Sequence, residues 1–266
     1  MTFVPVAGAG PVAATKNLVG GGNHATVGVE WFGEFANTGR LVATDGGFAA
    51  YFGIHRRWPD NVGHQGDTLR LLGKDGAPRA GAGWDWGCSH SLDQRLVFDG
   101  KSAQAMCVSD CYPTKGVLLN NRQAVISDEP SGNCAGKSDS SLGGLARTEA
   151  GLAATFVSKS ATGLDVAFAR IDAAGKPGAK TFVTSGAGAS RPMLAAFEGG
   201  FLAGWESKGK RFLAKLDAAG AAVGAPEEIP GAWADGSDFV TYPNGDVGWL
   251  TAGASLGVTR LAACPK

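Results

Sequence analysis

Residues 199–205 read GGFLAGW and residues 211–220 read RFLAKLDAAG. The same pair of segments occurs one step earlier, as GLAATFV at 151–157 and DVAFARIDAAG at 165–175. Equivalent positions in the two copies lie about 45 to 48 residues apart, a spacing typical of repeat proteins. The apolar segments are short and flanked by glycine, which favours strands over helices, and the Asp-Ala-Ala-Gly end favours a tight hairpin turn. Each copy therefore predicts a small antiparallel sheet.

Further copies extend this pattern in both directions. One lies near the end of the chain, with GDVGWLT at 245–251 and GVTRLAA at 257–263. Another lies near the start, with GGFAAYF at 46–52 and DTLRLLGKDG at 67–76. A degenerate unit stands between them: QRLVF at 94–98, GVLL at 116–119 and QAVI at 123–126. The sequence therefore predicts about five units, with six thinner ones as the alternative.

In its architecture the chain resembles the β-propeller superfamily over most of its length. A single small sheet cannot bury both of its faces, whereas sheets packed around a ring can. The resemblance implies an all-β fold of about five antiparallel blades, forming one domain over residues 1–266. No motif of a particular propeller family accompanies it, neither a Trp-Asp dipeptide in register nor a sialidase-type Asp box. The resemblance therefore implies no activity and no catalytic residues.

Composition excludes several classes of function. The chain has 42 glycines among 266 residues, about twice the usual share, which indicates many turns. Apolar residues make up 44%, enough for a buried core. The 24 basic and 24 acidic residues balance, so a nucleic-acid partner is not expected. No apolar run approaches 18 residues, so no membrane-spanning segment is expected.

Cysteine usage indicates an oxidising compartment. The five cysteines are Cys88, Cys107, Cys111, Cys134 and Cys264, and three of them fall close together in the sequence. This pattern predicts one or two disulfides and a secreted or periplasmic protein whose leader is absent from this chain. The alternative is a cytosolic protein with five reduced thiols.

Residue types that can bind a ligand or a metal are concentrated in the first 90 residues of the chain. All four histidines and four of the seven tryptophans lie there. Two segments stand out, HRRWPDNVGHQGD at 55–67 and WDWGCSHS at 84–91. The first lies between two predicted strands, where the later copies have only short turns. A long connection on a rigid scaffold is a favoured place for binding residues.

One hypothesis for these segments is a binding pocket. Indole rings offer apolar platforms, and carboxylates and amides bind hydroxyl groups, which suits a carbohydrate or another extracellular ligand. The candidate ligand-binding residues are Trp58, Asn61, His64, Gln65, Asp67, Trp84, Asp85 and Trp86. Trp84 and Trp86, two residues apart, are expected on one face of a strand. The alternative is that the tryptophans pack between blades, as expected for Trp205 and Trp249.

A second hypothesis is a metal site. Three imidazoles and one thiolate suit Zn²⁺ or copper, and Asp67 or Asp85 would orient an imidazole. The candidate ligands are His55, His64, Cys88 and His90. No CxxC pair or HExxH motif supports them. The alternative is that the histidines form structural hydrogen bonds and that Cys88 belongs to a disulfide.

Three classes of function follow. The leading expectation is a non-catalytic, lectin-like binding module. The others are a metal-binding protein or metal-dependent enzyme, and a scaffold for a protein partner. Nothing in the spacing of Cys88 and the histidines indicates a catalytic nucleophile, so we do not expect an enzyme. The sequence indicates neither the ligand's identity nor the oligomeric state.

Overall fold

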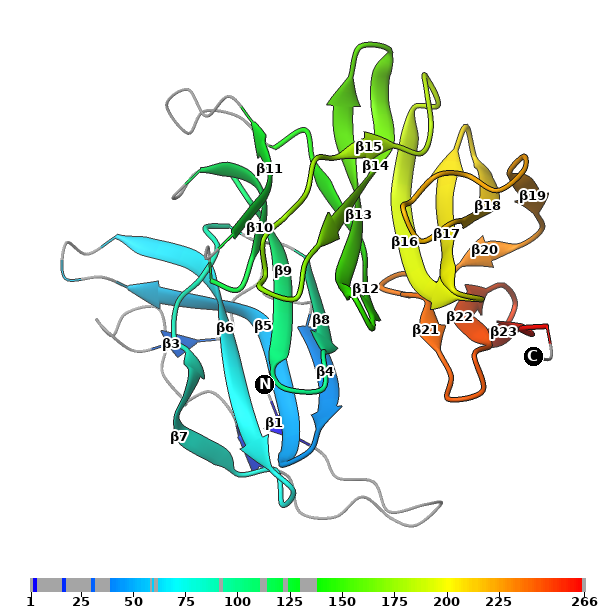
Figure 1. The fold of residues 1–266 in the computed structure, drawn as a ribbon. Coiled ribbons are helices and arrows are strands. Elements are labelled where there is room, and N and C mark those ends of the chain that lie inside the picture. The colour runs from blue at the N-terminus through cyan, green and yellow to red at the C-terminus, as the bar shows by residue number, and fades with distance from the viewer. Residues whose placement is uncertain are drawn as a thin grey trace. The chain divides into compact units, whose positions relative to one another are not determined.

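The computed structural model consists of strands and turns (Figure 1). It describes the backbone of residues 2–3, 16–17, 30–31, 39–57, 59, 62–90, 93–110, 114–121, 124–129 and 138–264, and the side chains of these ranges except 2–3, 16–17, 30–31 and 80–82. The described residues include no helix, so the predicted all-β class is confirmed. No helix long and apolar enough to cross a membrane occurs in these ranges.

Contacts along the chain group it into two compact units. The first comprises Met1–Gln123 with Pro130–Gly136, and the second comprises Ala124–Glu129 with Lys137–Lys266. Each unit is described separately below.

The first unit is built on a long hairpin. Its sheet has the order β3-β5-β6-β7, with β4 also pairing with β5. The strands of this sheet are β3 (Glu30–Trp31), β4 (Gly39–Thr44), β5 (Gly47–Arg57), β6 (Gly63–Gly73) and β7 (Pro78–Trp84). β5 and β6 pair without a register shift from Gly47 opposite Gly73 to Arg57 opposite Gly63. The first predicted site segment, 55–67, was expected to be a long connection between strands, and this is wrong: residues 55–57 belong to β5 and residues 63–67 to β6.

The degenerate repeat forms a sheet of its own. Its strands have the order β11-β10-β9-β8. They are β8 (Gln94–Phe98), β9 (Ala103–Ser109), β10 (Lys115–Leu119) and β11 (Ala124–Glu129). A short pair precedes both sheets: β1 (Thr2–Phe3) with β2 (Lys16–Asn17). The described residues of the three segments predicted for the degenerate repeat lie in β8, β10 and β11, of which β11 is grouped with the second unit.

The second unit contains three successive sheets. Their orders are β12-β13-β14-β15, β16-β17-β18-β19 and β20-β22-β21, with β23 pairing with β22. The strands are β12 (Ser141–Thr148), β13 (Gly151–Ser160), β14 (Gly163–Ile171), β15 (Thr181–Phe182), β16 (Ala189–Phe197), β17 (Gly200–Ser207), β18 (Lys210–Leu216), β19 (Glu227–Ile229), β20 (Ala232–Trp233), β21 (Val240–Thr241), β22 (Val247–Ala252) and β23 (Gly257–Leu261). The repeated segments quoted above form the adjacent pairs β13–β14, β17–β18 and β22–β23.

One turn geometry recurs after the second strand of the repeats. Gly175 N donates to Asp172 O (2.9 Å), and Gly220 N donates to Asp217 O (3.0 Å). Both glycines have left-handed φ values, 81° and 90°, a region that glycine adopts without strain. The predicted Asp-Ala-Ala-Gly turn is therefore confirmed.

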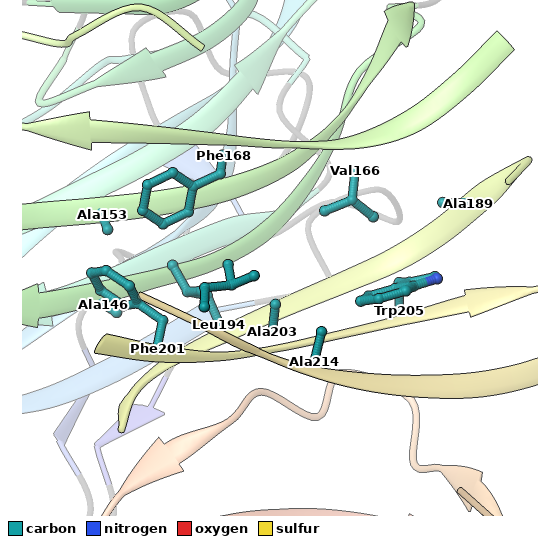
Figure 2. Packing of buried hydrophobic residues seen from close by; sticks show 11 residues of the cluster. Ala146, Ala153, Val166, Phe168, Ala189, Leu194, Phe201, Ala203, Trp205 and Ala214 are labelled. Carbon is teal, nitrogen blue, oxygen red and sulfur yellow. The ribbon is translucent and has the colours of Figure 1, made fainter. Parts of the chain in front are cut away.

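Apolar side chains fill the space between successive sheets of the second unit. Phe168 of β14 and Phe201 of β17 meet edge to face at 5.2 Å between ring centroids (Figure 2). Trp205 belongs to the same cluster, and Trp249 belongs to the next one, with Trp233 and Phe239. Trp205 and Trp249 therefore pack between sheets, as expected. Each large side chain that is fully buried in this way stabilises the fold by about 1.5–3 kcal/mol.

Five antiparallel sheets of four or five strands thus follow one another along the chain. The predicted fold class, a β-propeller of about five antiparallel blades, is confirmed.

Candidate functional site

The β5–β6 hairpin has two faces with different surroundings, because side chains alternate along a strand. On one face, Tyr51 and Leu69 pack with Trp84, and we call this the Trp84 face. On the other, Phe52 and Ile54 pack with Trp86, and we call this the Trp86 face. Trp84 and Trp86 therefore lie on opposite faces, and the expectation that they share one face is wrong. The reason is that β7 ends at Trp84, so strand alternation does not extend to Trp86.

The Trp84 face contains a buried carboxylate. Asp67 is fully buried, and its Oδ2 accepts a hydrogen bond from Tyr51 Oη at 2.5 Å. Its Oδ1 accepts a hydrogen bond from Cys88 N at 3.1 Å. Burial, together with the charge and hydrogen bond of Asp67, raises the pKa of Tyr51 well above its usual value, so the phenol remains a donor. Asp67 thus fixes the segment after β7 onto the hairpin.

Gly87 allows this close approach. A Cβ at position 87 would lie 1.9 Å from Asp67 Oδ1, so no other residue fits without a shift. Gln65, on the same face, is also buried, with 5% of its surface exposed. Asp67 and Gln65 are therefore predicted ligand-binding residues that the structure places in the interior rather than at a surface.

Cys88 forms a disulfide with Cys107 of β9, with 6.4 Å between the Cα atoms. A disulfide sulfur is not a thiolate, so Cys88 is not available as the predicted metal ligand in this form. The alternative expectation, that Cys88 belongs to a disulfide, is therefore confirmed. Cys264 is an exposed free thiol, while Cys111 and Cys134 lie outside the described residues.

The predicted metal ligands do not converge. His55 and His64 are on opposite faces of the hairpin, because their positions in β5 and β6 differ by one step of the pleat. In the described ranges, the one group of three or more ligating side chains with mutually close donor atoms is Asp67, Cys88 and Cys107, which contains the disulfide. Metal binding by the histidines stays a prediction.

On the Trp86 face, an indole lies directly on the sheet. A Cβ at Gly66 would lie 2.6 Å from Trp86 Cε2, so the absence of a side chain there makes room for the ring. The guanidinium of Arg56 lies 5.6 Å from the centroid of the same ring. Trp86 is half-buried, and the register places His64 directly opposite Arg56. An aromatic ring and polar groups therefore share one partly exposed surface.

Asp85 is an exposed neighbour of this surface. Its Oδ1 accepts a hydrogen bond from Arg70 Nη1. That hydrogen bond, with the charges of Arg70 and Arg56, lowers the pKa of Asp85 against a smaller opposing effect of burial. Asp85 is thus held as a carboxylate beside two arginines.

His64 and His90 lie close together. Their ring centroids are 6.4 Å apart. His90 Nδ1 lies 2.9 Å from Ser89 Oγ and 3.3 Å from Asp110 Oδ1. A serine–histidine–aspartate triad needs the hydroxyl and the carboxylate on different ring nitrogens. Here both are on Nδ1, so this trio is not arranged to activate Ser89.

Of the eight predicted ligand-binding residues, three lie at the partly exposed end of the hairpin: His64, Asp85 and Trp86. Trp84 is packed against Tyr51 at 5.8 Å between ring centroids. Trp58 and Asn61 lie outside the described residues. The predicted set is therefore divided between a surface and the interior.

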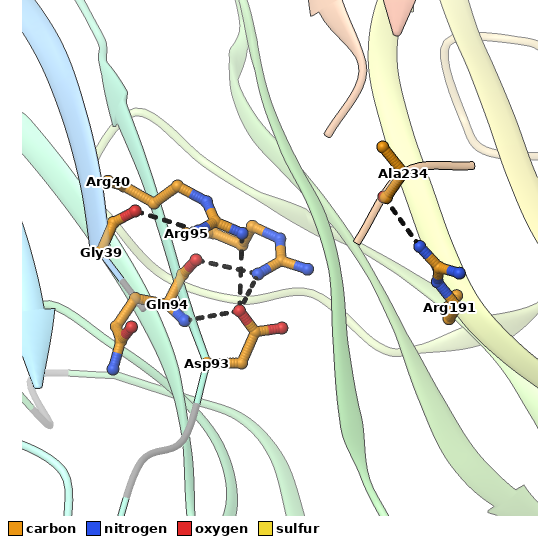
Figure 3. Close-up of polar contacts among 7 residues, drawn as sticks. All are labelled: Gly39, Arg40, Asp93, Gln94, Arg95, Arg191 and Ala234. Atoms are coloured by element: carbon orange, nitrogen blue, oxygen red, sulfur yellow. Dashed lines mark hydrogen bonds and ion pairs between the residues drawn. The ribbon is translucent and has the colours of Figure 1, made fainter. Parts of the chain in front are cut away.

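A charged cluster at the starts of β4 and β8 was not predicted from the sequence. Asp93 Oδ1 accepts a hydrogen bond from Arg95 Nη1 at 2.5 Å and lies 3.5 Å from Arg40 Nη2 (Figure 3). Arg95 is 10% exposed and Arg40 is 18% exposed at the side chain. Nothing in the repeat pattern marks these arginines, because they stand at strand starts where the other copies have unrelated residues. Figure 3 also shows Arg191 of the second unit, whose Nη2 donates to Ala234 O at 2.9 Å.

Comparisons with known proteins identify no family. No protein-family model matches the chain, and no curated protein matches it. Among solved structures, one described as "Crystal structure of glucose dehydrogenase" is similar, with a TM-score of 0.45 and 13% sequence identity. The match covers 84% of this chain and 82% of that one. A likeness of this strength supplies no substrate, cofactor or activity for this chain.

Proposed function

We propose that the chain is a secreted, non-catalytic, lectin-like β-propeller that binds a carbohydrate. The observation that carries the proposal is the half-buried indole of Trp86, seated on Gly66 at the end of a long hairpin. Sugar rings stack on such indoles through their C–H faces, while neighbouring charged groups bind the hydroxyls. Arg56, His64 and Asp85 are the neighbouring groups.

The non-catalytic part of the proposal rests on the arrangement of the polar groups. Asp67 is enclosed by its own hydrogen bonds, and Ser89 and Asp110 share one nitrogen of His90. These are arrangements that hold side chains in place rather than transfer protons. Secretion is supported by the disulfide between Cys88 and Cys107, since such bonds persist in oxidising compartments.

A glycan array at high surface density, followed by calorimetry with the best ligand, tests the binding function. Trp86→Leu keeps an apolar side chain against Gly66 but removes the ring. We expect it to lower affinity at least about tenfold, since interface tryptophans commonly contribute more than 1.4 kcal/mol.

The matched control is Phe182→Leu. Phe182 is an exposed aromatic residue in the second unit, with Lys180 Nζ 5.8 Å from its ring centroid, so it reproduces the ring-and-cation pair elsewhere. We expect no change in affinity. The proposal fails if no glycan binds, or if the two variants weaken binding equally.

Counting free thiols in the denatured, unreduced protein tests secretion separately. We expect the Cys88–Cys107 linkage in the peptide map of protein isolated from its native compartment. Five free thiols would contradict the secreted interpretation.

A further inference from the structure

The ring of His90 is held in a defined orientation. Its backbone is left-handed, with φ of 48°, and its N–H donates to Gln65 O at 3.1 Å. Asp110 N donates in turn to Ser89 O at 3.4 Å. A left-handed conformation costs a non-glycine residue about 1 kcal/mol or more, and such positions concentrate at functional sites. These bonds fix where the imidazole can point.

The carboxylate of Asp110 determines which nitrogen carries the proton. Its Oδ1 is buried and lies 3.3 Å from His90 Nδ1, while Ser89 Oγ lies 2.9 Å from the same nitrogen. A lone pair on Nδ1 would face this carboxylate oxygen and be repelled by it, whereas a proton on Nδ1 is attracted to the carboxylate. We therefore assign the neutral ring as the Nδ1–H tautomer, which leaves a lone pair on Nε2.

This arrangement is the one that metal-ligating histidines use. Such a histidine donates its other N–H to a carboxylate or carbonyl, which orients the ring and raises its basicity. Asp110 lies beside Nδ1 of His90, which is where an outer-sphere carboxylate lies beside a metal-bound imidazole. The side chain of His90 is 46% exposed, so water can complete a coordination sphere there.

His64 stands at the distance of a second ligand. A ligating imidazole nitrogen lies about 2.0–2.1 Å from zinc, which places each ring centroid about 3 Å from the metal and two centroids about 5–6 Å apart. The observed separation of His64 and His90 is 6.4 Å. A small rotation of the half-buried His64 side chain closes the difference.

We propose that His64 and His90 bind a divalent transition metal, Zn²⁺ or Cu²⁺, with Asp110 as a positioning residue and water as the remaining ligand. Imidazole nitrogens suit both ions. The site keeps two of the four ligands expected from the sequence and excludes His55, on the other face of the hairpin, and Cys88, in its disulfide. It does not depend on carbohydrate binding.

Calorimetric titration of the full chain, purified without a polyhistidine tag and treated with chelator, tests the proposal. Zinc and copper(II) chloride are the probes, used separately. We expect one equivalent of metal to bind, and His64→Ala and His90→Asn each to lower affinity at least about tenfold. Asparagine is chosen at position 90 because it tolerates left-handed φ, so that variant should fold.

Three further variants separate metal ligation from a structural role. His55→Ala is the matched control, because it removes a histidine from the same hairpin but from the opposite face, and its affinity should equal that of the wild type. Asp110→Ala should lower affinity about 10-fold, while Asp110→Asn should restore part of it, since an amide oxygen also accepts a proton from Nδ1. Thermal unfolding without metal verifies that each variant folds.

The proposal is overturned if neither ion binds saturably to the wild type. It is also overturned if His64→Ala and His90→Asn, both folded, bind metal as tightly as His55→Ala does. Glycan binding has no bearing on either outcome, because the two titrations use different probes.

Discussion

Gly175 and Gly220 occupy the same turn position in consecutive repeats, yet their surroundings differ. Both have left-handed φ values. A Cβ at Gly175 would meet nothing within 4 Å, whereas one at Gly220 would lie 2.2 Å from Cδ1 of the buried Phe168. The same residue type is therefore required for backbone conformation alone at one turn, and for conformation and packing at the other.

Alanine substitution should separate the two requirements. Gly175→Ala should lower the free energy of unfolding by about 1 kcal/mol, the cost of a left-handed alanine. Gly220→Ala should lower it by about 3 kcal/mol, because displacing Phe168 adds the cost of overpacking. Denaturant titration of both variants measures the difference, and equal losses would contradict the packing argument.

Asp165 is a buried charge that hydroxyl and backbone N–H donors stabilise. Ser160, Thr162 and Thr184 hydroxyls donate to its carboxylate at 2.6, 3.1 and 2.8 Å, and Gly186 N and Ala187 N donate at 3.0 Å. Burial alone would raise the pKa of Asp165, but these hydrogen bonds outweigh it and hold the pKa well below its usual value of 3.8. The sequence gives no sign of this site, because three of its donors belong to the segment 184–187, about 20 positions further along the chain.

The depressed pKa predicts a pH dependence of stability. A carboxyl whose pKa is lower in the folded state stabilises the fold fully above the unfolded value, and loses that contribution as pH falls toward the folded value. Asp165→Asn should therefore lower the free energy of unfolding by about 2–3 kcal/mol at pH 7, and by progressively less below about pH 4.

Denaturant titrations at pH 7 and pH 3 measure this effect. The control is Asp235→Asn, because that side chain is fully exposed and should change stability by less than about 0.5 kcal/mol at both pH values. A pH-independent loss in Asp165→Asn would show that the carboxylate charge is not what the donors stabilise.

At the scale of elements, the recurring turn is closed by a side chain as well as by the backbone. Asp172 Oδ1 accepts hydrogen bonds from Ala174 N and Lys176 N, both at 2.9 Å. Asp217 Oδ1 does the same with Ala219 N and Ala221 N, also at 2.9 Å. The aspartate satisfies two backbone donors that the turn leaves unpaired, which explains why aspartate begins both turns.

Removing these aspartates should weaken each turn independently. Asp172→Ala and Asp217→Ala should each lower the free energy of unfolding by about 1–2 kcal/mol, since two hydrogen bonds to a charged acceptor are lost. The double variant should lose the sum of the two, because the turns share no partner. A double-mutant cycle measures this, and a coupling above about 0.5 kcal/mol would contradict independent turns.

The positions of the strands could be predicted from the sequence better than the faces of the sheet on which side chains lie. The repeats predicted β13, β14, β17, β18, β22 and β23, because alternation and turn residues are local properties. The faces of Trp84 and Trp86 were not predictable, because the end of β7 is set by the hydrogen bond from Gly87 N to Asp67 O (2.8 Å), a contact between residues 20 positions apart. A site built from several segments depends on such contacts, which is why the predicted ligands divided between a surface and the interior.

At the scale of the whole molecule, the repeat period and the recognisable copies predicted about five blades, with six as the alternative, since each copy is one supersecondary unit. The pairing of the cysteines could not be predicted in this way. Cys88 lies in the segment after β7 and Cys107 lies in β9, 19 positions apart, and nothing local to either cysteine identifies its partner among the five. The disulfide joins the segment after β7 to β9, so its effect should be regional.

Removing that cross-link should therefore destabilise one unit and spare the other. Closing a loop of about 20 residues stabilises a fold by about 3 kcal/mol, through the entropy of the unfolded chain. In repeat architectures stability is shared locally between adjacent repeats rather than across the whole chain. Cys88→Ala with Cys107→Ala should increase amide hydrogen exchange in β5, β6 and β9, while β13, β14 and β17 keep wild-type protection. Exchange mass spectrometry at peptide resolution measures this, and an equal loss of protection in both units would show that they unfold as one.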